Sequence, residues 1–129
     1  MASAVDAVAR YVRTPKAVGL AVATVLAVAA AYATAILFVS SQLAFLSMVV
    51  LGVSVPTTLE SYGLLPATAT RTVPLVVGAC LVHWAVFLAL YVAAVAVASD
   101  LVAAAVAFVM TVLAGAVVGR SLQGPGTPD

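Results

Sequence analysis

Charge is what this sequence has least of. Nine of its 129 residues are charged, which is 7% of the chain, while 66% are hydrophobic. A water-soluble domain carries about a quarter charged residues, so this chain could not cover its own surface in water. Together with a mean hydropathy of +1.30, this composition predicts an integral membrane protein whose first partner is the lipid bilayer. The net charge of +1 offers no basic surface, so we expect no nucleic-acid partner.

Cysteine, histidine and tryptophan occur once each, as Cys80, His83 and Trp84. A single Cys cannot form an internal disulfide. The sequence has no glycine-rich phosphate loop, no paired carboxylates and no Ser-His-Asp arrangement outside the apolar runs. We therefore expect no enzymatic activity, no metal site and no resident cofactor.

Long apolar runs define the predicted fold. Hydrocarbon gives backbone amides no partners, and runs that are apolar on every face favour helices over a barrel. The charge-free run 17–59 would be about 65 Å long as one helix, twice the ~30 Å hydrocarbon core. It must therefore fold back, and Ser40–Gln42 is its only polar cluster.

The predicted fold class is an all-α membrane protein with four transmembrane helices arranged as two tandem helical hairpins. The transmembrane domain covers residues 17–119, with spans at about 17–39, 43–62, 73–99 and 101–118. We expect Pro56 to kink the second span. Thr57 and Glu60 have the spacing of a capping box for a short helical turn after it. Ser99 or Asp100 is expected to cap the fourth span.

The flanking segments are predicted to lie in the cytoplasm. Residues 1–16 show an amphipathic pattern, which fits either an interfacial helix or a frayed, solvated segment. Residues 120–129 are rich in Gly and Pro and are expected to be a disordered tail.

The basic residues predict the orientation. With four spans and a cytoplasmic N-terminus, all the basic residues lie on the cytoplasmic side, namely Arg10, Arg13, Lys16, Arg71 and Arg120. Only two short turns, one of them with the acidic Asp100, face outward. This satisfies the positive-inside rule, so we expect a multi-pass protein of the cell membrane with both termini cytoplasmic.

A shift of 59 residues aligns the two predicted hairpins. Arg13-Thr14-Pro15 then lies near Arg71-Thr72-Val73-Pro74, Tyr32 aligns with Tyr91, and Ser40 aligns with Ser99. We interpret this as an internal parallel repeat with its pseudo-twofold axis along the membrane normal. The alternative is that Pro, Gly and basic residues recur because any inside-to-outside helix starts in this way, although this does not explain the tyrosines.

Small residues mark candidate helix-packing positions, because they let helix backbones approach closely in lipid. The candidates are Gly115 and Gly119 in a GxxxG pattern, Thr111 on the same face, and Gly19 and Gly78 near the starts of the first and third spans. They serve either packing within the chain or a homo-oligomer interface.

A polar cluster occupies one sector of the third span: Cys80, His83, Trp84 and Tyr91. His83 is expected at mid-membrane, where an ionisable residue is a functional hypothesis by default. A proton relay would need a second titratable group at depth, haem ligation a second histidine, and a metal about four ligands. His83 is therefore only a weak cofactor-binding candidate, and a neutral histidine bonded to a neighbouring helix is the simpler interpretation. Trp84 is expected to pack against another helix.

The leading functional hypothesis is a non-catalytic membrane protein that acts through helix packing, as a homo-oligomer or as an accessory subunit of a membrane complex. The alternatives are a small channel or transporter with His83 in its pathway, and a haem-binding anchor subunit that uses His83.

Overall fold

The computed structural model describes residues 2–38 and 40–123 and is helical throughout its regular elements. In chain order these are α1 (Ala2–Tyr11), α2 (Pro15–Phe38), α3 (Ser41–Val49), the π-helix η1 (Val50–Ser54), α4 (Val55–Ser61), α5 (Ala69–Val95) and α6 (Asp100–Leu122). Since α3, η1 and α4 follow one another without a break, they form one continuous helix, Ser41–Ser61.

Four of these helices are long and apolar enough to cross a membrane, which matches the number of long apolar helices that the sequence predicts. They are Pro15–Phe38, Ser41–Ser61, Ala69–Val95 and Asp100–Leu122. The third begins four residues before its predicted start and ends four residues before its predicted end, and the fourth continues to Leu122. Residue 39, at the predicted end of the first span, lies outside the described residues, as do residue 1 and positions 124–129 of the predicted tail.

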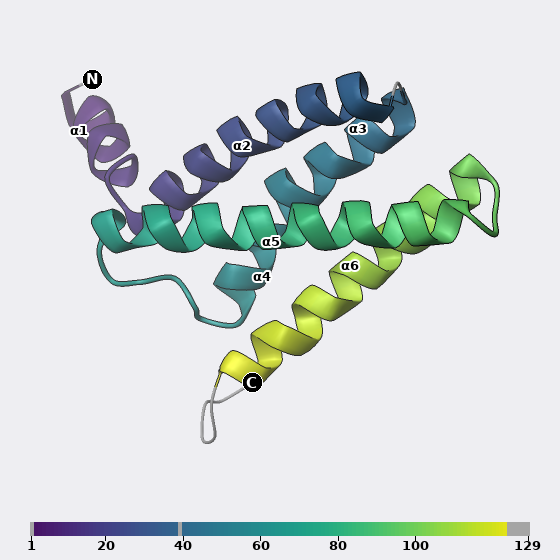
Figure 1. The fold of residues 1–129 in the computed structure, drawn as a ribbon. Coiled ribbons are helices and arrows are strands. Elements are labelled where there is room, and N and C mark those ends of the chain that lie inside the picture. The colour runs from purple at the N-terminus through teal and green to yellow at the C-terminus, as the bar shows by residue number, and fades with distance from the viewer. Residues whose placement is uncertain (1, 39, 124–129) are drawn as a thin grey trace.

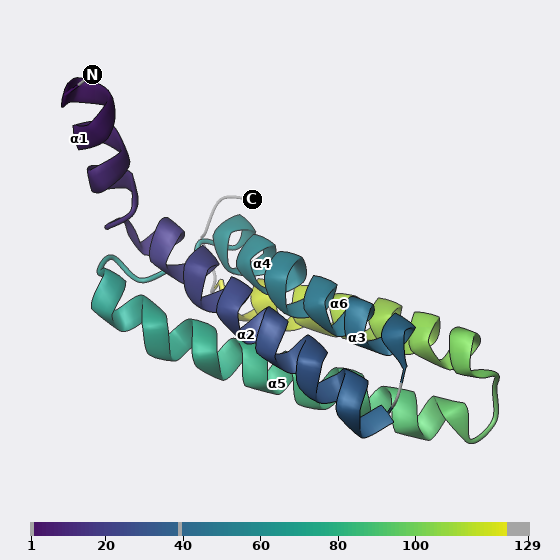
Figure 2. The same cartoon turned by 90° about the horizontal axis from the view of Figure 1, so that it is seen from above.

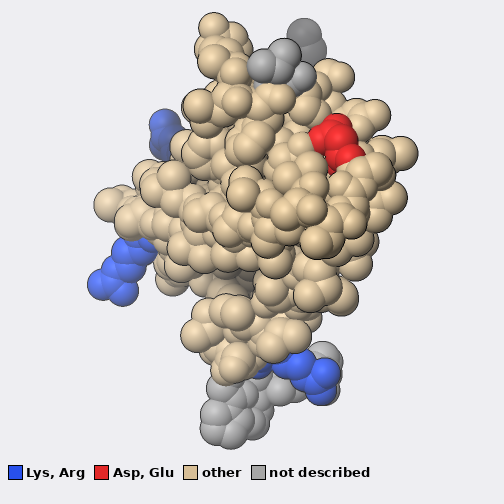
Figure 3. Space-filling model, turned by 45° about the vertical axis from the view of Figure 1, so that its right-hand side comes forward, with Lys and Arg blue, Asp and Glu red and all other residues tan. Residues whose placement is uncertain are grey.

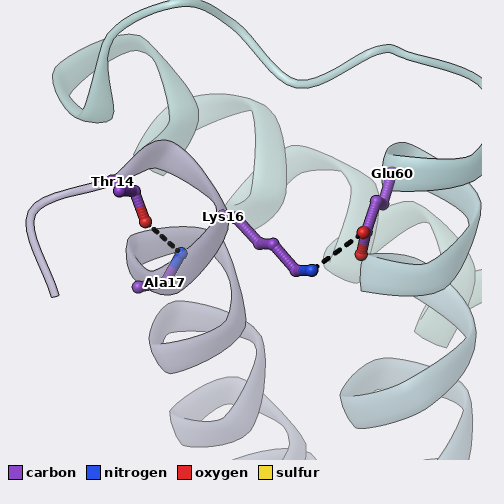
Figure 4. Close-up of polar contacts among 4 residues, drawn as sticks. All are labelled: Thr14, Lys16, Ala17 and Glu60. Atoms are coloured by element: carbon purple, nitrogen blue, oxygen red, sulfur yellow. Dashed lines mark hydrogen bonds and ion pairs between the residues drawn. The ribbon is translucent and has the colours of Figure 1, made fainter. Parts of the chain in front are cut away.

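Hydroxyl side chains cap the starts of all four spans. Each accepts a hydrogen bond from the backbone N–H three residues ahead, which satisfies one of the free amides at a helix start. The capping residues are Thr14, Ser40, Thr68 and Ser99. The prediction that Ser99 or Asp100 caps the last span is thus confirmed for Ser99. At the start of α2, the Ala17 N–H donates to the Thr14 hydroxyl (Figure 4). Pro15 takes the first helical position, where its missing N–H costs nothing.

The second span passes Pro56 without ending. Pro56 has no N–H to donate to the carbonyl of Gly52, and its ring would collide with that carbonyl in a regular α-helix. The preceding residues widen into the π-helix, in which the Val55 N–H donates to the carbonyl of Val50, five residues back. The predicted capping role of Thr57 is wrong, because Thr57 lies inside α4.

The helices run back and forth between two ends of the molecule (Figures 1 and 2). α2 packs against α3 and α5, and α5 packs against α6. The start of α2 meets the end of α4 through Lys16 and Glu60, so these termini share one end, which we call the basic end. Arg71 near the start of α5 and Arg120 near the end of α6 belong to it. Asp100 begins α6 at the opposite end.

Small side chains form much of the core. The buried faces of α2 and α6 are lined by alanines, among them Ala23, Ala27, Ala103 and Ala107, while Phe87 and Leu43 fill the wider spaces between helices. Only 22% of the most apolar window of α2 is buried inside the chain. Large apolar side chains such as Val25 and Val117 are therefore about 70% exposed. Figure 3 shows the result on one face, where uncharged surface dominates, basic groups project at the outline and one small acidic patch lies at the upper right. This suits lipid, which needs no polar covering.

The two halves of the proposed repeat have different environments. Thr14 caps α2, whereas Thr72 lies buried inside α5 and Thr68 caps that helix instead. Tyr32 is 71% exposed, whereas Tyr91 is 6% exposed. The structure therefore does not confirm a repeat.

Candidate functional site

The polar cluster of the third span divides between two neighbours of α5. Trp84 contacts α2 through a hydrogen bond, and Tyr91 packs edge-on against Phe38 of α2, with ring centroids 5.6 Å apart. Cys80 is fully buried and lines a cavity together with residues of α2, including Leu26. His83 lies on the other side of α5, against α6. The sector predicted from the sequence is therefore two separate contact surfaces.

Thr34 joins three helices at a buried polar node. Its Oγ1 lies 2.7 Å from the carbonyl of Ala30, 3.1 Å from Trp84 Nε1 and 3.3 Å from Ser47 Oγ. A hydroxyl has one proton and two lone pairs. Because the Ala30 carbonyl can only accept, Thr34 donates its proton there and accepts from the indole, which leaves Ser47 as the donor to Thr34. The node is saturated, and it holds α2, α3 and α5 together.

His83 has one satisfied and one unsatisfied ring nitrogen. Nδ1 lies 2.7 Å from the carbonyl of Ala79, one turn earlier in α5, so Nδ1 carries a proton and donates it. Nε2 is buried and has no hydrogen-bond partner among residues 2–38 and 40–123. A Cβ added at Gly115 would lie 2.8 Å from this nitrogen. The absence of a side chain at Gly115 thus makes room for the imidazole between α5 and α6.

Gly119, the other glycine of the GxxxG pattern, likewise leaves room for side chains of a neighbouring helix. A Cβ at Gly119 would lie 2.7 Å from the ring of Tyr62 and 3.1 Å from Thr58, both at the end of the second span. Thr111, on the same face of α6, is buried and donates its hydroxyl proton to the carbonyl of Ala107. Side chains of the same chain therefore pack closely against both glycines of this face, which also borders the groove described below.

Gly19 and Gly78, which align in the proposed repeat, differ sharply. A Cβ at Gly19 would lie 3.2 Å from Thr72 and 3.4 Å from Val76, so this glycine lets α2 approach α5 closely. A Cβ at Gly78 would have nothing within 4 Å in the described part of the chain. Gly78 is exposed.

Gly78 lines a groove of about 530 Å³ whose other lining residues come mostly from α4, α5 and α6. The ribbons of α5 and α6 diverge away from their connecting turn (Figure 1). Pro74, Gly78 and Val82 form a ridge along α5, Val118 belongs to α6, and His83 lies at the inner end of the groove. The groove is almost entirely apolar and opens to the side of the bundle. We call it the Gly78 groove.

Two polar pairs lie at the ends of the bundle. At the basic end, Lys16 Nζ lies 2.9 Å from Glu60 Oε1 (Figure 4). At the other end, the Tyr91 hydroxyl donates to Asp100 Oδ1. Within residues 2–38 and 40–123, no group of three His, Cys, Asp or Glu side chains is placed to hold a metal ion.

Sequence reasoning missed Thr34 as the partner of Trp84 and Ser47 as the partner of Thr34. It also missed Thr58 and Tyr62 as the neighbours of Gly119. Thr34 and Ser47 are hydroxyl residues inside otherwise apolar spans, and this rarity could have marked them. Comparison with protein families, with curated proteins and with solved structures found no match.

Proposed function

We propose that the protein is a non-catalytic integral membrane protein that works by helix association, and that two copies meet in the bilayer through the Gly78 groove. The observation that carries this proposal is the empty space beside Gly78. A small residue on an outward-facing helix wall lets a second backbone approach closely, and close packing is a main source of association energy between helices in lipid. Gly115 and Gly119 are less suited, because His83 and Tyr62 already fill the space above them.

A second copy fits this groove for a geometric reason. Copies inserted with the same orientation present α5 in the same direction and Gly78 at the same depth. A two-fold axis along the membrane normal then sets the ridge of Pro74, Gly78 and Val82 against the same ridge of the other copy. Apolar surface meets apolar surface along the whole contact. We therefore favour self-association over an accessory subunit that docks on another protein.

The proposal includes the orientation and the origin of the chain. Lys16, Arg71 and Arg120 lie at one end and Asp100 lies at the other, which supports cytoplasmic termini in the cell membrane by the positive-inside rule. The arrangement as two tandem hairpins from an ancestral duplication rests on the shared Tyr, Ser, Gly and Pro framework of the sequence.

The alternatives both require access to His83. A channel or transporter with His83 in its pathway, or a haem-binding anchor, would need Nε2 to be reachable by solvent or iron. Nε2 is buried against Gly115, so these functions have less support.

Cysteine cross-linking in lipid vesicles tests the proposal. In a Cys80→Ala background, we expect Gly78→Cys to form disulfide-linked dimers on oxidation, because the two-fold axis passes close to this position. Val25→Cys is the matched control, since Val25 is 69% exposed on α2 and lies at a similar distance from the basic end. A monomer that forms no cross-link at position 78 would overturn self-association and leave the accessory-subunit hypothesis.

Gly78→Leu tests the same groove without cross-linking. A Cβ here would have nothing within 4 Å among the described residues, and the rest of a leucine side chain can extend into the groove. We therefore expect unchanged thermal unfolding but a shift from dimer to monomer in light scattering, while Val25→Leu remains dimeric. An unaltered dimer in Gly78→Leu would place the interface elsewhere.

A further inference from the structure

A second cavity lies at the basic end of the bundle, away from the Gly78 groove. It measures about 290 Å³ and is enclosed by α2, η1, α4 and the first turns of α5. Lys16, Thr57 and Glu60 form its polar rim, and the walls below are apolar, among them Leu20, Leu59 and Val76. We call it the rim pocket.

Two glycines line this pocket, Gly19 in the first turns of α2 and Gly52 in the π-helix. Each also faces a neighbouring helix closely, since a Cβ at Gly19 would lie 3.2 Å from Thr72 and one at Gly52 would lie 3.4 Å from Ala27. Pro56, which also lines the pocket, fixes the widened turn below the rim. A π-turn inside an α-helix often marks a functional position.

The rim holds one charge of each sign, and both are accessible. Lys16 Nζ and Glu60 Oε1 are 2.9 Å apart, and the two side chains are 55% and 54% exposed (Figure 4). An ammonium group has three donors and a carboxylate accepts up to about four hydrogen bonds, so this pair leaves capacity on both sides. An exposed ion pair contributes little to stability, and a ligand can separate it at small cost.

The position of the pocket relative to the bilayer indicates the kind of ligand. The rim lies where the spans end, at the level of the lipid headgroups, and the apolar walls extend toward the hydrocarbon. A molecule that fills both parts needs a charged head and an apolar tail. Because the rim is neutral overall, a purely anionic head would meet Glu60 as well as Lys16.

We propose that the rim pocket binds a zwitterionic phospholipid with a primary ammonium headgroup. Lys16 binds the phosphate, Glu60 accepts hydrogen bonds from the ammonium, and part of an acyl chain lies against the apolar walls. A quaternary ammonium headgroup has no N–H to donate to Glu60. A headgroup that carries only a negative charge is repelled by the Glu60 carboxylate. The pocket therefore selects by the pair of charges rather than by net charge.

Native mass spectrometry of the delipidated full chain tests this with three probes of equal chain length: dioleoyl phosphatidylethanolamine, phosphatidylcholine and phosphatidylglycerol. We expect phosphatidylethanolamine to bind about tenfold more tightly than the other two, the change associated with one charge-assisted hydrogen bond. Equal binding of all three, or tightest binding of phosphatidylglycerol, would overturn the proposal.

Single substitutions assign the two halves of the headgroup. Glu60→Gln should abolish the preference for phosphatidylethanolamine over phosphatidylcholine and improve phosphatidylglycerol binding, because the repelling charge is gone. Lys16→Gln should weaken all three lipids. Arg71→Gln is the matched control, since Arg71 is an exposed basic residue near the same end that does not line the pocket. If Glu60→Gln binds the three lipids with the same ranking of affinities as the unmodified chain, the assignment of Glu60 to the ammonium is contradicted.

Lipid binding and self-association can be separated. Gly78 does not line the rim pocket. Gly78→Leu should therefore leave the ranking of the three lipid affinities unchanged, whether or not it dissociates the dimer.

Discussion

The imidazole of His83 occupies the space that a side chain at position 115 would need. A Cβ at position 115 would lie 2.8 Å from Nε2, closer than van der Waals contact allows. We expect Gly115→Ala to lower the free energy of unfolding by about 1–3 kcal/mol, the usual cost of an extra methyl group in a packed interior. Thermal unfolding followed by circular dichroism in detergent measures the change.

The control for this prediction is the same substitution at another glycine. Gly78→Ala adds the same methyl group where nothing lies within 4 Å, so the better helix propensity of Ala should leave stability equal or higher. His83→Ala combined with Gly115→Ala should recover stability relative to the sum of the single changes, because the clash is removed. A Gly115→Ala protein as stable as the unmodified chain would contradict the assigned contact.

Part of this site could be predicted from residue types alone. The rarity of Cys80, His83 and Trp84 singled them out, although the structure divides them between two contact surfaces. The packing of the partly buried Trp84 against another helix was expected from its depth. Their partners could not be predicted, because helix spacing gives the face of a residue but not which helix lies opposite. Thr34 is 50 residues from Trp84 in sequence, and only the packing of α2 on α5 brings them together.

At the scale of elements, the cap of a helix depends on local sequence, whereas the continuation of a helix through a proline also depends on tertiary contacts. Ser99 could be recognised as a cap because capping needs only the local backbone. Thr57 has the same local signature but lies inside α4. The π-turn before Pro56 lets the helix continue, and the contacts of Leu59 with the core and of Thr58 and Tyr62 with Gly119 hold α4 in line.

The π-helix gives a second prediction. It accommodates one residue more than a regular α-helix would over the same rise, so deleting Val53, which is 59% exposed, should restore an α-helical register. With Pro56 kept, the deletion should be strongly destabilising, because proline in a regular helix interior costs about 3 kcal/mol or more. Pro56→Ala added to the deletion should recover most of this loss in thermal unfolding. If the Val53 deletion is equally stable with Pro56 and with Pro56→Ala, the proline does not require the π-turn.

At the scale of the whole molecule, the distribution of charge predicts the orientation. Position 97 lies in the turn between α5 and α6 and is 89% exposed, and position 67 lies in the exposed segment between α4 and α5. On intact cells, a membrane-impermeant maleimide should label Val97→Cys but not Ala67→Cys, with Cys80 silent because it is buried. Labelling of Ala67→Cys alone would reverse the proposed orientation.

The sequence by itself determined that the regular elements of the described residues are helices and that four of them are long and apolar enough to cross a membrane, since both follow from composition and run length. Tertiary structure decided which small residues are used inside the chain and which remain open. Gly19, Gly115 and Gly119 accommodate neighbouring side chains, whereas Gly78 accommodates none. All four look alike in sequence, because a glycine carries no information about what lies opposite it until the helices cross.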